Sequence, residues 1–140
     1  MESQDLRKAG LKVTLPRLKV LEILETSPQR HLSAEDVYKA LLEMGEEIGL
    51  ATVYRVLTQF EGAGLVSRLN IDGGHAVFEL EDGEHHDHLF CVKCNRIIEF
   101  YDEVIEERQK AIAKANGFEM TDHSLYIYGF CNRDDCEKDR

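Results

Sequence analysis

The stretch ATVYRVLTQFEG, residues 51–62, is followed closely by LVSRLNI, residues 65–71, and AVFEL, residues 76–80. One side of the first stretch is apolar at the three- and four-residue spacing of a helix face, at Val53, Val56, Leu57 and Phe60. The other two stretches are rich in apolar residues and flank Asp72-Gly73-Gly74, whose glycines tolerate the positive φ of a tight turn. Together they predict a helix followed by a β-hairpin.

Three more helices are predicted upstream. A short one covers about residues 5–9, and a second begins near Thr14 and ends before Pro28, because proline is excluded from a helix interior. The third begins at Ser33, whose hydroxyl can cap it with Asp36 three residues on. The apolar residues that we expect to face the core are Leu18, Leu21, Leu24, Val37, Ala40, Leu41 and Met44. Helices that lead into a hairpin predict a winged helix-turn-helix.

The polar side of the helix over residues 51–62 carries Thr52, Tyr54 and Arg55. Hydrogen-bond donors and a cation on an outward helix face suit entry into the DNA major groove. Most polar helix faces are simply solvated, so both interpretations remain open on this pattern alone.

The net charge of −10 argues against a nucleic-acid partner, but the charge is unevenly distributed. Residues 81–140 hold eight Lys and Arg against fifteen Asp and Glu, whereas residues 7–30 hold six against two. A basic region near the N-terminus therefore stays compatible with DNA.

The second half predicts a small sheet with one long helix. Strands are expected over residues 88–92, 96–100, 118–123 and 125–130, and a helix runs from its cap at Asp102 to about residue 116. Such a sheet has open edges, which favours a partner subunit.

We therefore predict an α+β protein. Its N-terminal winged helix-turn-helix DNA-binding domain covers residues 1–82, and a C-terminal α/β dimerisation and metal-binding domain covers residues 83–140.

Two cysteine pairs, Cys91/Cys94 and Cys131/Cys136, have the spacing of a structural zinc site with four thiolate ligands. The sequence shows neither a signal peptide nor an apolar segment of membrane-spanning length, which predicts a cytoplasmic protein without a membrane partner. In that reducing compartment zinc is favoured over the alternative, a redox dithiol or disulfide pair.

The run His85-His86-Asp87-His88 precedes the first cysteine pair. In an extended chain His85 and Asp87 project to one side and His86 and His88 to the other, so one run can supply two metal sites. The further ligands that each site needs are sought among Glu79, Glu99, Glu106 and His123. For the glutamates, solvated surface positions remain an alternative.

Several long segments closely resemble the ferric uptake regulator family of bacterial metal-dependent repressors. They are KAGLKVTLPR at residues 8–17, SAED at 33–36, GLATVYRVL at 49–57, DGG at 72–74 and HHDHLFCVKC at 85–94. The resemblance covers nearly the whole chain.

The resemblance implies three metal sites. It implies a regulatory site at the hinge between the domains, with the ligands His31, Glu79, His86, His88 and Glu99. It implies a second site in the dimerisation domain, with the ligands His85, Asp87, Glu106 and His123. The structural zinc corresponds to Cys91, Cys94, Cys131 and Cys136.

For DNA, the resemblance assigns Lys12 to the minor groove and Tyr54 and Arg55 to the major groove, and we add Thr52 and Arg17, the latter as a phosphate contact. The function expected is a homodimeric, Fe(II)-responsive repressor that binds operator DNA and controls iron-uptake genes, with pairing of dimers left open. Mn(II), Co(II) or Zn(II) can substitute for Fe(II).

Three alternative functions are a relative that senses zinc or manganese, a cytosolic metal buffer, and a metallo-hydrolase. The hydrolase is disfavoured because the sequence has no H-E-x-x-H helix, no G-x-S-x-G elbow and no P-loop.

Overall fold

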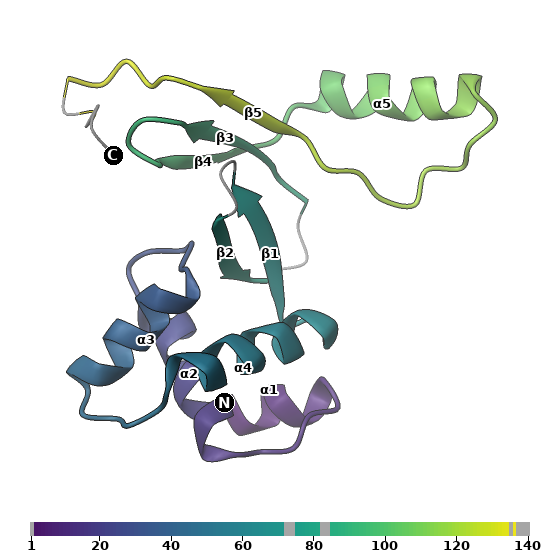
Figure 1. Cartoon of the computed structure of the whole chain (residues 1–140). Helices are drawn as coiled ribbons and strands as arrows, with labels where there is room; N and C mark the ends of the chain where they lie inside the picture. The colour runs from purple at the N-terminus through teal and green to yellow at the C-terminus, as the bar shows by residue number, and fades with distance from the viewer. Residues whose placement is uncertain (1, 72–74, 82–84, 135, 137–140) are drawn as a thin grey trace. The chain divides into compact units, whose positions relative to one another are not determined.

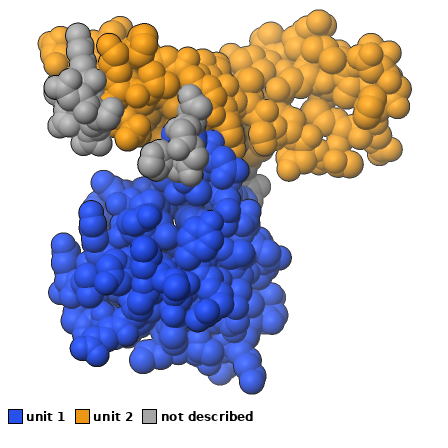
Figure 2. Space-filling view, in the orientation of Figure 1, with its two compact units in different colours: residues 1–83 blue, residues 84–140 orange. Residues whose placement is uncertain are grey.

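The computed structural model describes residues 2–71, 75–81, 85–134 and 136. The chain divides into two compact units, Met1–Gly83 and Glu84–Arg140, drawn in blue and orange in Figure 2. Helices and sheets occur in the same chain, which confirms the predicted α+β class. The turn predicted at residues 72–74 lies outside the described residues.

The first unit begins with four helices, α1 (Glu2–Lys8), α2 (Leu15–Thr26), α3 (Ala34–Glu43) and α4 (Leu50–Gly62), which Figure 1 shows gathered into one bundle. All four predicted helices are present. The start of α3 follows the predicted capping box, because Ser33 accepts from the backbone N–H of Asp36 and the Asp36 carboxylate accepts from that of Ser33.

An antiparallel hairpin, β1 (Val66–Ile71) and β2 (His75–Leu80), completes the first unit as the predicted wing. Its register places Arg68 opposite Phe78, and a bridge between Leu32 and Phe78 joins β2 to the segment before α3. The buried apolar core of this unit comprises Leu6, Val20, Leu21, Ile23, Leu24, Leu32, Ala34, Val37, Leu41, Val53, Val56, Leu57, Phe60, Val66 and Phe78.

Met44 departs from the prediction. It was expected in the core, but its side chain is 45% exposed. The residue is the C-cap of α3, and Gly45 follows with a φ of 80°. Because the chain turns away at this cap, the helical periodicity that would bury the next apolar position no longer applies.

The second unit contains β3 (Asp87–Cys91), β4 (Ile97–Phe100), α5 (Glu103–Ala115) and β5 (Tyr126–Gly129). β3 is the middle strand of three, antiparallel to β4 and parallel to β5 (Figure 1). The strand predicted over residues 118–123 is wrong, because this segment has no regular structure and forms the connection from α5 to β5. It has strand-like alternation but no strand to pair with, and Phe118 within it is 72% exposed.

The apolar side chains of the second unit are largely at the surface. Among its described residues only Phe90 and Cys91 are buried hydrophobics. Large apolar side chains exposed there include Tyr101, Val104, Ile112, Phe118, Ile127, Tyr128 and Phe130. No helix in the described part of the chain is long and apolar enough to cross a bilayer.

Candidate metal centres and DNA-binding face

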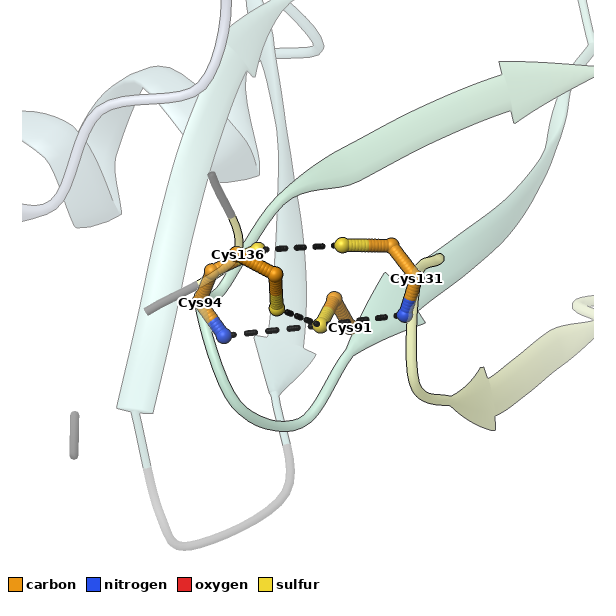
Figure 3. Close-up of side chains that lie close together, drawn as sticks. All are labelled: Cys91, Cys94, Cys131 and Cys136. Atoms are coloured by element: carbon orange, nitrogen blue, oxygen red, sulfur yellow. Dashed lines mark hydrogen bonds between the residues drawn. The ribbon is translucent and has the colours of Figure 1, made fainter. Parts of the chain in front are cut away.

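Four cysteine side chains converge at one end of the sheet in the second unit (Figure 3). Cys91 ends β3 and Cys94 lies in the turn after it. The parallel register sets Gly129 beside Cys91, so the chain that leaves β5 brings Cys131 next to Cys91. The Sγ atoms of Cys91 and Cys136 are 3.6 Å apart, as are those of Cys94 and Cys131. Tetrahedral zinc–thiolate geometry places its sulfurs at about 3.8 Å, so the spacing matches.

The surroundings of this cluster stabilise one cysteine as a thiolate but disfavour the deprotonation of all four. The backbone N–H groups of Cys131 and Cys94 each donate to Cys91 Sγ at 3.4 Å, and they lower the pKa of Cys91 to about 5. The neighbouring Cys131 thiol, together with burial, raises the pKa of Cys136 to about 12. A bound divalent cation removes the cost of deprotonating all four thiols, because metal-bound thiols are deprotonated. The donor set therefore fits zinc.

A second cluster joins two imidazoles and two carboxylates within the second unit. His85 Nε2 lies 3.0 Å from Asp87 Oδ1, and His123 Nε2 lies 3.2 Å from Glu106 Oε1. Asp87 begins β3, Glu106 lies in the first turn of α5, and His123 lies in the connection to β5. One ligand atom from each of these four residues lies within 4.8 Å of the others. The structure thus brings together all four residues of the predicted second site.

The burial of this cluster supports a cation. Asp87 is fully buried and Glu106 is 7% exposed. Asp87 Oδ1 faces two imidazoles, whereas Oδ2 is buried without a hydrogen-bond partner among the described residues. Two buried carboxylates require positive charge nearby, from imidazolium groups or from a metal ion. Imidazole and carboxylate donors suit a divalent ion such as Fe(II), Mn(II), Co(II) or Zn(II).

The first unit supplies two residues of the predicted regulatory site. His31 Nε2 lies 3.1 Å from Glu79 Oε2, because the Leu32–Phe78 bridge aligns the two chain segments. Arg30 Nε donates to the same oxygen of Glu79 at 2.8 Å. Glu79 is only 6% exposed, so its carboxylate is held in a shielded position beside one imidazole and one guanidinium.

The second unit supplies the other three residues of that set. His88 and Glu99 are paired across β3 and β4, with His88 Nε2 3.5 Å from Glu99 Oε2. His86 Nδ1 lies 3.9 Å from the same oxygen. His86 and His88 therefore lie near Glu99, whereas His85 lies near Asp87 and Glu106, which confirms the predicted division of the histidine run between two faces.

The polar face of α4 is exposed as predicted. Tyr54 is 47% exposed and Arg55 is exposed beside it, while Thr52 is half-buried and accepts from Arg55 Nη2 at 3.4 Å. Lys12, in the segment between α1 and α2, is also exposed. These positions leave one hydroxyl and two cations available to a ligand at the surface of the first unit.

Arg17 is engaged within the fold. Its Nη1 donates to the backbone oxygen of Lys12 at 2.8 Å, and its Nε and Nη2 donate to Gln59 Oε1 at 3.3 and 3.1 Å. One guanidinium therefore ties the segment that carries Lys12 to α4.

Comparison with known proteins agrees with this geometry. Residues 8–128 match the sequence profile of the Ferric uptake regulator family. The chain belongs to that family. The ferric uptake regulation protein of Legionella pneumophila is 72% identical over 130 residues, covering 93% of this chain and 96% of the relative.

Two solved structures of the ferric uptake regulator family extend the likeness to three dimensions. The Vibrio cholerae ferric uptake regulator, whose crystal structure reveals a rearrangement of the DNA-binding domains, is 57% identical with a TM-score of 0.86, covering 94% of this chain and all of that one. The Pseudomonas aeruginosa regulator with manganese is 61% identical with a TM-score of 0.82, covering 95% of this chain and 99% of that one.

Two arginines of this ferric uptake regulator family member were missed in the sequence. Arg30 adjoins a predicted ligand, His31, but its contact with Glu79 depends on a pairing between distant segments. Arg68 lies in the predicted wing, and its contact with Phe78 on β2 depends on the register of the hairpin, which no local pattern in the sequence signals.

Proposed function

We propose that this protein is a homodimeric, Fe(II)-responsive transcriptional repressor that binds operator DNA and thereby controls iron-uptake genes. One observation carries most weight: the chain joins a winged helix with an exposed polar α4 face to a unit that holds clustered imidazole and carboxylate ligands around a buried Asp87. The Legionella relative is named for ferric uptake regulation.

The cysteine quartet is proposed as a structural zinc site. Its residues come from the end of β3, from the turn after it and from the segment after β5, so a shared ion fixes that segment to the sheet. With four protein ligands, no coordination position remains open for catalysis, which suits a regulator rather than a hydrolase.

The regulatory ion is proposed to be held by His31 and Glu79 from one unit and by His86, His88 and Glu99 from the other, as the family resemblance implies. When bound, the ion supplies a double positive charge that neutralises the two carboxylates. Glu79 and Glu99 then act as ligands from separate units, which restricts how far α4 can turn away from the dimerisation unit. Two α4 helices of a dimer must match half-sites spaced about 34–36 Å apart on B-DNA. Restricted orientation therefore favours operator binding.

The second ligand set is proposed to hold a further divalent ion within the dimerisation unit. Asp87 begins β3 and Glu106 lies in the first turn of α5, so shared ligation fixes the helix to the sheet. Imidazole and carboxylate donors select weakly among Fe(II), Mn(II), Co(II) and Zn(II). We favour Fe(II) from the relatives' names, and the Pseudomonas structure contains manganese.

On DNA, Tyr54 and Arg55 are proposed to contact base edges in the major groove, with Thr52 orienting Arg55 and Lys12 entering the minor groove. Arg17 remains proposed as a phosphate contact, and its hydrogen bonds to the backbone oxygen of Lys12 and to Gln59 hold the Lys12 segment against α4. A bidentate arginine contact to guanine is the commonest specific contact in such interfaces.

The homodimer is supported by the surface of the second unit. Val104, Phe118 and Phe130 are each about seven-tenths exposed, and both edge strands β4 and β5 have one unpaired side within the described sheet. A second copy of the same unit can cover this apolar surface and pair an open edge.

An anaerobic titration tests the proposal. Duplexes that the protein binds are first enriched from a fluorescent duplex library. Binding of the protein to the library and to the enriched duplexes is then measured with increasing Fe(II), Mn(II) or Zn(II). We expect sequence-selective binding that appears with Fe(II) and is reversed by a chelator. Metal uptake without any gain in duplex binding would instead identify a metal buffer, and a response restricted to Zn(II) or Mn(II) would identify a sensor of that ion.

A further inference from the structure

Arg68, on strand β1 of the wing, contacts a single stripe of the DNA-facing helix α4. Its Nη1 donates to the Tyr54 hydroxyl at 3.4 Å and its Nη2 donates to Thr58 Oγ1 at 3.3 Å. Its Nε lies 3.3 Å from Glu61 Oε1. Tyr54, Thr58 and Glu61 are spaced by four and three residues, so they form one row along two turns of the helix. One side chain thus links the wing to the full length of this row.

Two aromatic rings hold the same guanidinium. Arg68 Cζ lies 5.1 Å from the centroid of Phe78, its partner across the hairpin, and 5.5 Å from the centroid of Tyr54. The Tyr54 and Phe78 rings meet edge to face with centroids 6.5 Å apart. Phe78 is fully buried, so Arg68 rests on a fixed part of the core. Guanidinium groups at this distance from a ring are attracted by its π electrons.

These contacts determine how Tyr54 can form hydrogen bonds. Its oxygen accepts from Arg68, so its own hydroxyl hydrogen points toward a different acceptor. Thr58 is different, because its hydroxyl accepts from Arg68 and donates to the backbone oxygen of Tyr54 at 3.0 Å. The Thr58 hydroxyl therefore already donates and accepts within the protein. Tyr54 is thus the hydroxyl of this row that can donate a hydrogen bond to a ligand.

We propose that Arg68 is a positioning residue that fixes Tyr54 as a hydrogen-bond donor toward an acceptor on operator DNA and that makes no phosphate contact itself. This proposal rests on the proposed DNA-binding function. The alternative for an arginine in a wing is a direct phosphate contact. Against it, the Arg68 side chain is only 22% exposed, and its charge is paired with the more exposed Glu61.

A positioning role and a phosphate contact predict different salt dependences of duplex binding. They also predict different effects of replacing Arg68 by lysine. Each phosphate contact contributes about 0.9 to the slope of log affinity against log salt, and a lysine can replace arginine in such a contact. Lysine cannot donate to Tyr54 and Thr58 together in the planar arrangement of a guanidinium. We therefore expect both Arg68→Lys and Arg68→Gln to lower duplex affinity roughly tenfold, with the salt slope unchanged.

The experiment uses the full chain loaded with Mn(II) and a duplex enriched from a random-sequence pool by the wild-type protein. Lys39→Gln, at an exposed position on α3, is the control for loss of one positive charge. In a Tyr54→Phe background the effect of Arg68→Lys should shrink below about twofold, since the hydroxyl that Arg68 orients is gone. Wild-type affinity of Arg68→Lys, or a slope reduced by about one unit in Arg68→Gln, would overturn the proposal.

A DNA-free measurement separates this proposal from the proposed function. In protein labelled with 3-fluorotyrosine, the Tyr54 resonance is assigned from its loss in Tyr54→Phe. We expect Arg68→Lys to shift and broaden this resonance while the thermal melting curve stays cooperative. An unchanged resonance would refute the positioning role even if the wild type bound no duplex. A shifted resonance without duplex binding would refute the DNA function alone.

Discussion

Replacing Asp87 by asparagine tests whether the His85–Asp87–Glu106–His123 cluster holds a divalent ion. Asparagine keeps the shape of the side chain but removes the charge of a fully buried carboxylate. This carboxylate has Oδ1 between two imidazoles, at 3.0 and 3.6 Å, and a buried Oδ2 without a hydrogen-bond partner among the described residues. Loss of a charged ligand should therefore weaken ion binding strongly while the apo fold tolerates the change.

The magnitude follows from linkage between binding and folding. Outer-shell partners of a metal cost about 10- to 100-fold in affinity when removed, so we take about 100-fold as the minimum for a direct ligand. At a free ion concentration of 100 times the dissociation constant, binding adds about 2.7 kcal/mol to the free energy of unfolding. For Asp87→Asn at the same concentration this gain falls to about 0.4 kcal/mol. The apo protein should change by about 1 kcal/mol or less, because asparagine keeps the shape of the side chain and an oxygen that can accept a hydrogen bond.

Urea unfolding with and without Mn(II), at pH 7.5 and with zinc retained, measures both quantities. All proteins carry His88→Ala, so that the other set of histidine ligands does not contribute. Glu107→Gln is the matched control, since it removes one exposed carboxylate from α5 next to Glu106. Asp87 is not a ligand if Asp87→Asn keeps a manganese-dependent gain in the free energy of unfolding of about 2 kcal/mol or more. The same conclusion follows if the control Glu107→Gln loses this gain.

Three further predictions concern the other sites. His88→Ala in the otherwise wild-type chain should abolish metal-dependent duplex binding while zinc content and dimer mass stay unchanged, and an intact metal response would remove His88 from the regulatory set. Arg55→Ala should lower duplex affinity by about 1–3 kcal/mol without changing metal uptake, so wild-type affinity in a fluorescence anisotropy assay would contradict the assignment of α4. Cys136→Ser should lose the zinc measured by atomic emission and expose the segment after β5 to protease, because three thiols then remain from the quartet; full zinc retention would show that Cys136 is no ligand.

Capping residues and glycines in the sequence predicted well where the helices begin and end. The caps at Ser33 and Asp102 are formed as the sequence indicated, with Asp102 accepting from the backbone N–H groups of Val104 and Ile105. Gly117 ends α5 with a φ of 80°. Such signals depend on neighbours within a few residues, which is why they can be recognised in a single sequence.

Pairing between distant segments could not be predicted in the same way. Residues 118–123 alternate like a strand, but of the two strands predicted after α5 only the second forms, as β5, and it pairs with β3 in parallel. The alternation of a strand does not say which partner it will meet. The segment instead carries His123 to Glu106.

The metal ligands were predicted best where the alternation of one short segment fixes the side of the chain to which each side chain points. The alternation of residues 85–88 divided the ligands between two faces, as the contacts of Asp87 and His88 show. The guanidinium networks of Arg17 and Arg68 were not predicted, because a long side chain can reach many partners and only the packed fold selects among them.

The parallel pairing of β5 with β3 brings together cysteines that are far apart in the chain, so the proposed zinc ligands are synthesised at different times. Cys131 and Cys136 follow their sulfur neighbours by 37 and 45 residues. At about 5–20 residues per second, a ribosome needs roughly 2 to 9 seconds to synthesise that interval. A nascent chain presents two thiols first and completes the set only when Cys136 has been made, so binding of the proposed zinc ion by all four thiols requires translation through Cys136.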